Sequence, residues 1–128
     1  ESVYSLLKIQ IERFGLTDNF RILDNKIINK VTGSEFMFYG LWRHISEIKS
    51  IESIDILWSE ESHALTETQW EILEPTIRKE GSECWLLFNP NLVSDFVWRN
   101  FVADPPADTL VRLINFDENP FLSSTARR

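Results

Sequence analysis

The first residues of the chain carry apolar side chains at the spacing of an amphipathic helix. This pattern extends over residues 3–14, and Gly15 follows at a position where a helix commonly stops. We therefore expect a helix with one apolar face that ends at Gly15. The apolar residues on that predicted face are Val3, Leu6, Leu7, Ile11 and Phe14.

Two extended runs follow the predicted helix. Residues 20–31 and 34–39 are rich in residues that favour strands, and Thr32-Gly33 between them is a turn signal. The arrangement predicts a β-hairpin. Residues 40–53 are mixed and polar, and their pattern predicts no particular element.

In the middle of the chain an apolar run stops abruptly at two carboxylates. Residues 54–58 are mainly apolar, and Ser59 leads from them into the adjacent acids Glu60 and Glu61. A short apolar run bounded by polar residues is typical of a buried strand. In open α/β sheets the ligand crevice lies beyond the carboxyl ends of such strands. The two acids therefore stand where a ligand would bind.

A helix is predicted after the acids. Thr66, followed by Gln69 three residues later, has the spacing of a capping box. Pro75 is expected to kink or restart the helix, because proline removes a backbone donor, and Gly81 is expected to end it. A second core strand then begins near Glu83. The apolar residues at helical spacing are Trp70, Leu73 and Ile77.

The second predicted core strand also ends at a polar residue, although that residue is uncharged. The apolar run at residues 84–88 passes into the polar Asn89. Beyond it the pattern predicts a short helix over about residues 95–102, a third strand at 109–116 and a turn at 117–120. Strands that alternate with helices predict an α/β fold with right-handed parallel crossovers. We expect a mostly parallel sheet with flanking helices and the hairpin upstream.

Composition narrows the class of protein. The 128 residues are enough for one domain with a core, and 43% are hydrophobic. The net charge of -7 argues against nucleic-acid binding by this segment alone, because non-specific affinity for the phosphate backbone comes chiefly from Lys and Arg. No apolar run approaches the roughly 18 residues of a membrane span. A single cysteine, Cys84, excludes a disulfide framework and favours a reducing compartment.

The polar residues at the two strand ends point to nucleotide hydrolysis. A nucleoside triphosphatase needs Mg²⁺ near the β- and γ-phosphates, a group that orients water, and a cradle for the phosphates. One of Glu60 and Glu61 would hold Mg²⁺ through its water shell, and the other would orient and polarise the attacking water. Asn89 would contact the γ-phosphate or that water.

Plainer interpretations stand beside this one. Two Glu after an apolar run are often solvated loop carboxylates, and Ser59-Glu60 is an alternative acid pair that would leave Glu61 a bystander. His63 lacks the partners of a zinc site, and Cys84 in a buried strand is usually inert. The remaining polar candidates have bland interpretations too. Arg78 would act on phosphate or on a neighbouring subunit, or it would be a cation favoured by a helix C-terminus. Lys49-Ser50 would contact nucleotide or DNA, or it would be a solvated loop pair, and His44 would be a surface or loop residue.

Several of these motifs occur in the same order in a known family. The stretch from "IKSIESIDILWSEESHALTETQW" to "PTIRKEGSECWLLFNPN" resembles the ATPase domain of tailed-bacteriophage terminase large subunits. The similarity extends upstream through "GSEFMFYGL" and downstream to "FDENPFL", so it covers nearly the whole chain. The resemblance implies that residues 1–118 form the C-terminal part of that ATPase domain. Residues 119–128 would begin a linker toward a nuclease domain.

The resemblance also implies roles and partners. It implies a partial RecA-like P-loop NTPase core, with Glu60 as the Walker B acid on the metal side and Glu61 as the catalytic glutamate. Asn89 would belong to the motif that couples hydrolysis to DNA movement. The implied cofactors are Mg²⁺ and ATP. The implied partners are double-stranded DNA, the portal protein and the terminase small subunit, in an oligomeric ring in the host bacterial cytoplasm.

Two departures from the family pattern matter. Walker B commonly has Asp at the first acid position, where this chain has Glu60. No glycine begins a G-x-x-x-x-G-K-[ST] loop, which in this family lies upstream of residue 1. We therefore expect that this chain alone neither binds nor hydrolyses ATP appreciably. Two alternatives stay open: a non-catalytic interaction domain, as in a prophage remnant that retains the fold, and another P-loop translocase or helicase.

Overall fold

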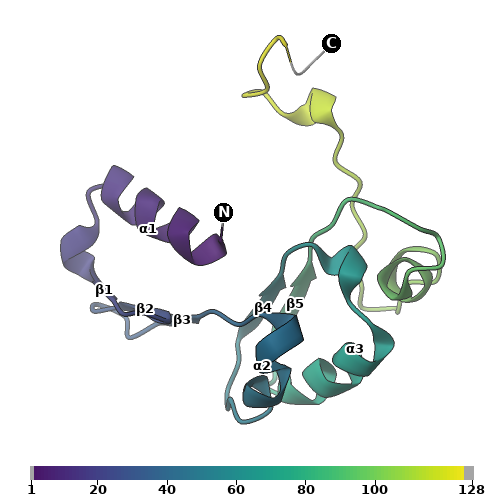
Figure 1. The fold of residues 1–128 in the computed structure, drawn as a ribbon, viewed down its shortest axis with the longest axis horizontal. Helices are drawn as coiled ribbons and strands as arrows, with labels where there is room; N and C mark the ends of the chain where they lie inside the picture. The colour runs from purple at the N-terminus through teal and green to yellow at the C-terminus, as the bar shows by residue number, and fades with distance from the viewer. Residues whose placement is uncertain (1, 126–128) are drawn as a thin grey trace. The chain divides into compact units, whose positions relative to one another are not determined.

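The computed structural model describes residues 2–125, apart from the side chains of residues 41–44. The chain divides into two compact units, residues 1–51 and residues 52–128 (Figure 1). Each unit has its own sheet. We describe each by itself.

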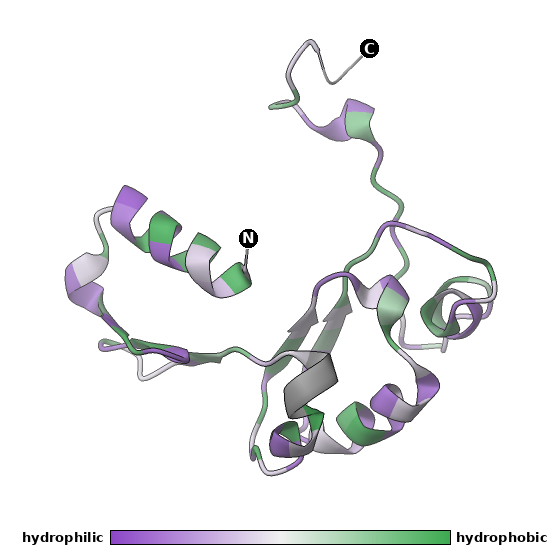
Figure 2. Cartoon of the chain, in the orientation of Figure 1, coloured by the Kyte–Doolittle hydropathy of each residue, from purple (hydrophilic) through white to green (hydrophobic). Residues whose placement is uncertain are grey.

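The first unit begins with the predicted helix. Helix α1 spans Val3–Arg13, and the Ser2 hydroxyl caps it by accepting a hydrogen bond from the backbone N–H of Ser5. Gly15 follows with φ of 66°, a left-handed conformation that glycine adopts without steric cost. The helix is amphipathic, with hydrophobic and hydrophilic residues on its turns (Figure 2). The prediction of a helix that stops at Gly15 is confirmed.

The sheet of this unit has three antiparallel strands in the order β1-β2-β3. They span Phe20–Ile22, Lys26–Asn29 and Glu35–Met37. The hairpin predicted at Thr32-Gly33 joins β2 to β3, and Gly33 has φ of 76°. The prediction of one continuous run over residues 20–31 is wrong. Asp24-Asn25 is a turn signal within that run, and the chain reverses there.

Residues 40–53 contain a helix that the sequence analysis did not predict. Helix α2 spans Leu41–Ile48, with Gly40 at its N-cap. The three apolar positions that define its period, Leu41, Ile45 and Ile48, are spaced by four and three residues. Polar residues between them concealed that period, and Ile48 is buried.

The second unit is built on a parallel strand pair. β4 spans Ile56–Ser59 and β5 spans Glu83–Leu86, and their register pairs Trp58 with Trp85. The crossover between them contains helix α3, Glu67–Leu73. The predicted parallel strand-helix-strand arrangement is therefore confirmed, although this sheet has only two strands.

Helix α3 begins where the sequence predicts but ends earlier than predicted. The capping box is complete: the Gln69 N–H donates to Thr66 Oγ1, and the Thr66 N–H donates to Gln69 Oε1. Pro75 restarts the chain as a 3-10 turn, Glu74–Thr76, as predicted. The helix therefore ends well before Gly81, which lies instead in the turn that leads into β5.

A small apolar core lies within the second unit. Leu65, Leu73 and Val97 keep no more than 2% of their surface exposed. Trp70 and Phe101 pack edge to face, with ring centroids 5.1 Å apart. The helical segment predicted over residues 95–102 is present and ends in a π-helical turn, Trp98–Val102.

The predicted third strand is absent from the part of the chain that the structure describes. Residues 109–118, here called the exposed segment, are extended up to a three-residue 3-10 turn, Phe116–Glu118. Leu110 keeps 92% of its surface exposed and Leu113 keeps 71%. A strand exists only through its hydrogen-bonded neighbour, and no described strand pairs with this segment.

The fold is therefore α/β, with one antiparallel and one parallel sheet. The expected parallel sheet is present but has two strands among the described residues, and the upstream antiparallel strands form a separate sheet of three. A RecA-like core is not established by these elements. Among the described helices, none has the length and apolar character to cross a membrane.

Candidate functional site

The carboxyl ends of β4 and β5 are joined by hydrogen bonds. The Leu87 N–H donates to the Ser59 carbonyl at 2.9 Å, and the Leu87 carbonyl accepts from the Ser62 N–H at 3.0 Å. The Ser62 hydroxyl is fully buried and donates to the Ser59 carbonyl at 2.7 Å. Its oxygen also lies 2.9 Å from Ser59 Oγ. These contacts fix the turn that carries the two acids.

Glu61 has an unusual backbone conformation within this turn. Its φ of 53° and ψ of 39° are left-handed, which costs a non-glycine residue roughly 1–2 kcal/mol. The 3-10 turn Ser62–Ala64 follows it directly. The anchored Ser62 holds the backbone in this conformation, and the Glu61 side chain keeps 75% of its surface exposed.

Glu60 is oriented by the strand that precedes it. Its Oε1 accepts a hydrogen bond of 2.8 Å from the indole N–H of Trp58, two residues earlier on the same face of β4. Glu83 accepts the indole N–H of Trp85 in the same way, and the two tryptophan rings stack at 5.8 Å. One carboxylate oxygen of Glu60 is therefore occupied by Trp58, while Oε2 makes no described hydrogen bond.

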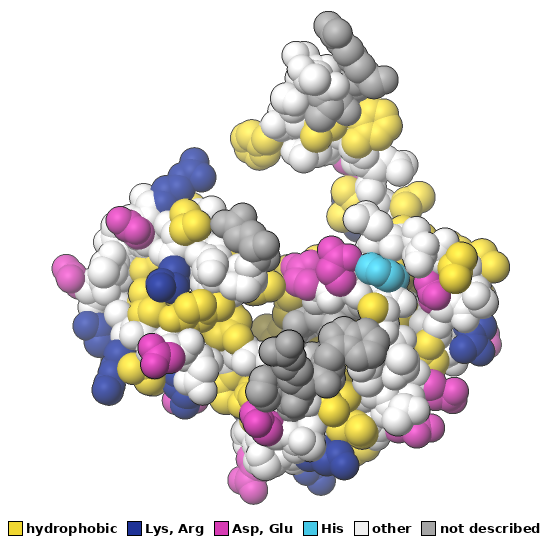
Figure 3. All heavy atoms as spheres, viewed as in Figure 1, with side chains coloured by type: hydrophobic (Ala, Val, Ile, Leu, Met, Phe, Trp, Pro, Cys, Tyr) yellow, Lys and Arg dark blue, Asp and Glu magenta, His cyan; other side chains and the backbone are white. Residues whose placement is uncertain are grey.

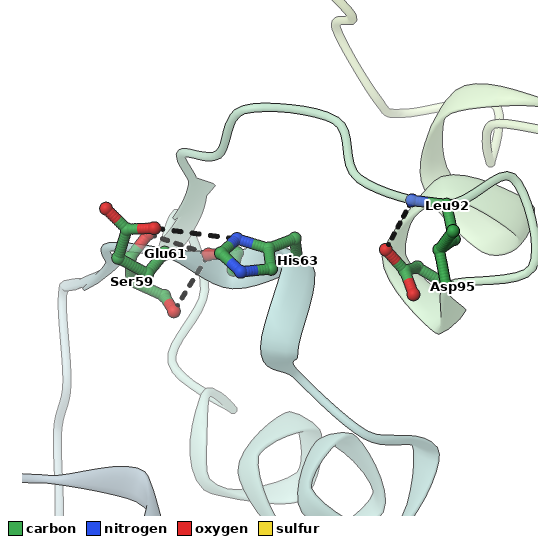
Figure 4. A network of polar contacts seen from close by, with 6 residues as sticks. Ser59, Glu61, His63, Leu92 and Asp95 are labelled. Atoms are coloured by element: carbon green, nitrogen blue, oxygen red, sulfur yellow. Dashed lines mark hydrogen bonds and ion pairs between the residues drawn. The ribbon is translucent and has the colours of Figure 1, made fainter.

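His63 lies beside Glu61 at the end of this turn. Its Nδ1 is 3.5 Å from Glu61 Oε2, and the two side chains face each other (Figure 4). The Nδ1 atom is buried and makes no hydrogen bond within the described residues. Acidic side chains and a histidine adjoin on the surface in the space-filling view (Figure 3).

Asn89 is exposed in the loop after β5, two residues beyond Leu87. The far end of this loop is closed by Asp95, whose Oδ2 accepts from the Leu92 N–H at 3.0 Å (Figure 4). Because Leu87 bonds to both ends of the acid-bearing turn, the structure brings the loop of Asn89 to the same sheet edge as Glu60 and Glu61. The roles predicted for these three residues stay predictions.

The structure also describes the local settings of Arg78, Lys49-Ser50 and His44. Arg78 lies beyond the end of α3, so the interpretation as a cation at that helix terminus is wrong. Ser50 donates to the Glu47 carbonyl at 2.7 Å, next to the exposed Lys49 at the end of α2. His44 lies within α2 rather than in a loop, and its side chain is outside the described residues.

Cys84 was expected to be buried, and that expectation is wrong. The residue is exposed on β5, opposite Leu57 in the register. The surrounding chain still desolvates the sulfur, and this burial raises the pKa of the Cys84 thiol from 9.0 to about 11. The thiol therefore stays protonated near neutral pH and is a poor nucleophile.

The donor set at the sheet edge suits Mg²⁺ only if other groups complete the coordination. No three His, Cys, Asp or Glu side chains gather to hold a metal in the described part of the chain. Mg²⁺ in phosphate-transfer sites is commonly held by one or two carboxylates, waters and the phosphates themselves. The free Oε2 of Glu60 fits that arrangement.

Sequence reasoning missed the residues that build the turn. Ser59 and Ser62 are only three apart, a spacing at which serine hydroxyls commonly bond to nearby backbone. That spacing was a usable signal. The part played by Leu87 had no local signal, because its partners lie 25 and 28 residues earlier in the chain.

Comparison with known proteins identifies the family. A family model described as phage terminase large subunit matches residues 1–128, the whole of this chain. No curated protein matches the chain significantly. The match agrees with the family that the sequence resembles. The chain therefore belongs to the phage terminase large subunit family.

Proposed function

We propose that this chain forms part of the ATPase motor of a terminase large subunit, which couples ATP hydrolysis to the packaging of viral DNA into a procapsid. The observation that carries the proposal is the hydrogen-bonded junction of Ser59, Ser62 and Leu87. It places two adjacent carboxylates and the Asn89 loop at one sheet edge. Family membership supports the packaging role.

In this proposal Glu61 is the catalytic glutamate. Its side chain is exposed beyond the strand end, and its backbone is held in a left-handed conformation. Strained backbone of this kind clusters at functional sites. The carboxylate would accept a hydrogen bond from the attacking water, orient it and polarise it.

Glu60 is the acid proposed for the metal side. Trp58 fixes one of its oxygens, which leaves Oε2 to face the water shell of Mg²⁺. The ion, when bound, would neutralise charge on the β- and γ-phosphates. Ser59 is buried and bonded to Ser62, which favours Glu60-Glu61 over Ser59-Glu60 as the functional pair.

Asn89 is proposed to contact the γ-phosphate or the attacking water and to report whether the phosphate is present. Its amide has both a donor and an acceptor for that purpose. Residues around its loop would pass the signal toward DNA. The proposed partners are double-stranded DNA, the portal protein and the terminase small subunit, in a ring in the host bacterial cytoplasm.

The test compares this chain with a version extended upstream to include a glycine-rich phosphate loop. Equilibrium binding of a fluorescent ATP analogue with Mg²⁺ should be detected only for the extended version, because P-loop amides and lysine supply most of the phosphate affinity. Turnover by that version should fall at least about 100-fold in Glu61→Gln, the scale of general-base catalysis. Sustained turnover by the 128-residue chain alone, lost in Glu61→Gln, would contradict the half-site prediction.

A second candidate is an interaction domain without chemistry. One observation favours it: the stacked Trp58 and Trp85 keep 53% and 49% of their surfaces exposed, beside the exposed Ile56. Exposed aromatic groups of this kind are common where proteins bind partners. Absence of nucleotide binding in both the short and the extended versions would favour this candidate.

A further inference from the structure

His63 is a polar group at the sheet edge to which the proposed function gives no role. Its Nδ1 is buried and has no hydrogen-bond partner among the described residues. A buried polar atom without a partner costs roughly 1–3 kcal/mol, so such an atom calls for an explanation. The nearest ionic group is the Glu61 carboxylate, with Nδ1 and Oε2 3.5 Å apart.

The backbone around His63 keeps the two side chains facing each other. Ser62, which lies between them, is fully buried and anchored to both Ser59 and Leu87. The Ala64 N–H donates to the Glu61 carbonyl at 3.1 Å, which closes the turn on its other side. Glu61 and His63 therefore project from a fixed turn. A small rotation of the exposed Glu61 side chain would bring the oxygen within hydrogen-bonding distance of Nδ1.

We propose that His63 is a positioning residue for Glu61: its Nδ1–H donates to Oε2 and leaves Oε1 to accept from the attacking water. The inference rests on the proposed function, because it assigns His63 to the same hydrolysis site. The Nδ1–H tautomer is inferred from the geometry. Orientation of a catalytic group is worth a large factor in rate, since misplacement by about 1 Å costs on the order of 100-fold.

The physical effect is a restriction of the Glu61 side chain. With 75% of its surface exposed, the carboxylate would otherwise sample several rotamers. A partner on one oxygen selects the rotamer in which the other oxygen points toward the water. His63 would thus change the turnover rate and leave nucleotide affinity nearly unchanged, because it need not contact the nucleotide.

The kinetic test uses the extended, nucleotide-binding version of the protein. His63→Leu removes the donor at similar size and should lower kcat about 10-fold with KM nearly unchanged, the lower end of the range for residues that orient ligands through a hydrogen bond. His63→Asn places an amide N–H close to the position of Nδ1 and should restore most of kcat. The control is Lys79→Leu, which breaks an exposed ion pair with Asp55 at the opposite end of β4. It should leave kcat and KM unchanged.

A second measurement tests the contact without turnover. In the 128-residue chain, the ¹⁵N chemical shift of His63 Nδ1, assigned by its loss in His63→Leu, should move in Glu61→Gln. A His63 signal that does not respond to Glu61→Gln would show that no contact exists and would overturn the inference.

The kinetic outcomes separate this inference from the proposed function. If Glu61→Gln abolishes turnover and His63→Leu leaves kcat unchanged, the proposed function stands and the positioning role is wrong. If His63→Asn is as slow as His63→Leu, packing rather than a donated hydrogen bond explains the loss, and the inference also fails. If the extended protein binds ATP but Glu61→Gln is fully active, the proposed role of Glu61 fails, and the positioning role fails with it.

Discussion

β5 and the exposed segment of residues 109–118 both have the apolar pattern of a strand, but their structures differ. Both contain runs of apolar residues that favour strands, and both were predicted to be strands. β5 pairs in parallel with β4 along its whole length. The exposed segment pairs with none of the described strands, and its side chains are largely exposed.

The difference shows that an apolar, strand-favouring sequence does not by itself form a β-strand. It also needs a neighbouring strand with which to form hydrogen bonds. Between β4 and β5 the chain has α3, whose capping box and apolar face determine where the crossover begins and what it packs against. The connection to the exposed segment contains Pro105-Pro106, and Leu110 near the start of the segment is almost fully exposed. The two regions therefore offer matched positions at which to test what pairing and packing contribute.

The largest difference is expected for truncation of leucine side chains. Leu73 in α3 is 1% exposed, and Leu73→Ala should lower the free energy of unfolding by about 3 kcal/mol, from lost burial plus the cavity left behind. Leu110 is 92% exposed, and Leu110→Ala should change it by less than about 0.5 kcal/mol. Urea unfolding followed by tryptophan fluorescence measures both. Equal losses would mean that the exposed segment packs in solution.

Proline substitution tests the strand pairing itself. Leu87→Pro removes the backbone donor to the Ser59 carbonyl and should destabilise the second unit by about 2 kcal/mol, because a hydrogen bond at the junction of the two strands is lost and only the Ser62 hydroxyl still donates to that carbonyl. Leu113→Pro, in the exposed segment, should be nearly neutral. Hydrogen exchange of the amides in β4 and β5 reports the effect locally. Protection unchanged by Leu87→Pro would contradict the pairing.

The reactivity of a thiol on β5 can be compared with that of a thiol placed in the exposed segment. Since burial raises the pKa of Cys84 to about 11, its alkylation by iodoacetamide at pH 8 should be about tenfold slower than that of Leu113→Cys in a Cys84→Ser background. The Cys84 rate should keep rising toward pH 11, where the control has levelled off. Because the raised pKa disfavours ionisation in the folded state, stability should also fall as pH rises from about 9 to 11. Equal rates at pH 8 would show that Cys84 is not desolvated.

The smallest effect is expected at two capping boxes. Thr66 and Asn115 each cap a turn reciprocally, with Gln69 and Glu118 respectively. Thr66→Ala should cost about 1 kcal/mol, because α3 packs against the core and its first turn loses an acceptor. Asn115→Ala should cost almost nothing, since its three-residue turn is exposed. The same urea titrations decide this, and a larger loss at Asn115 would reverse the comparison.

Local signals were sufficient wherever an element is determined by neighbouring residues. α1 with its Gly15 stop, the hairpin at Thr32-Gly33 and the capping box of Thr66 were all predicted and found. Two of the errors fall where one local signal masks another. Asp24-Asn25 was overlooked within an apparent strand, and the period of α2 was hidden by polar residues.

For the candidate site, the sequence by itself determined the chemistry available: two adjacent carboxylates after one apolar run and an asparagine after the next. Only the tertiary structure decided which residues meet. It joined Ser59 and Ser62 to Leu87, placed His63 against Glu61 and left the exposed segment unpaired among the described strands. The reason is physical. Composition and spacing fix local conformation, whereas contacts across 25 or more residues depend on how the strands pair and on what the helix between them buries.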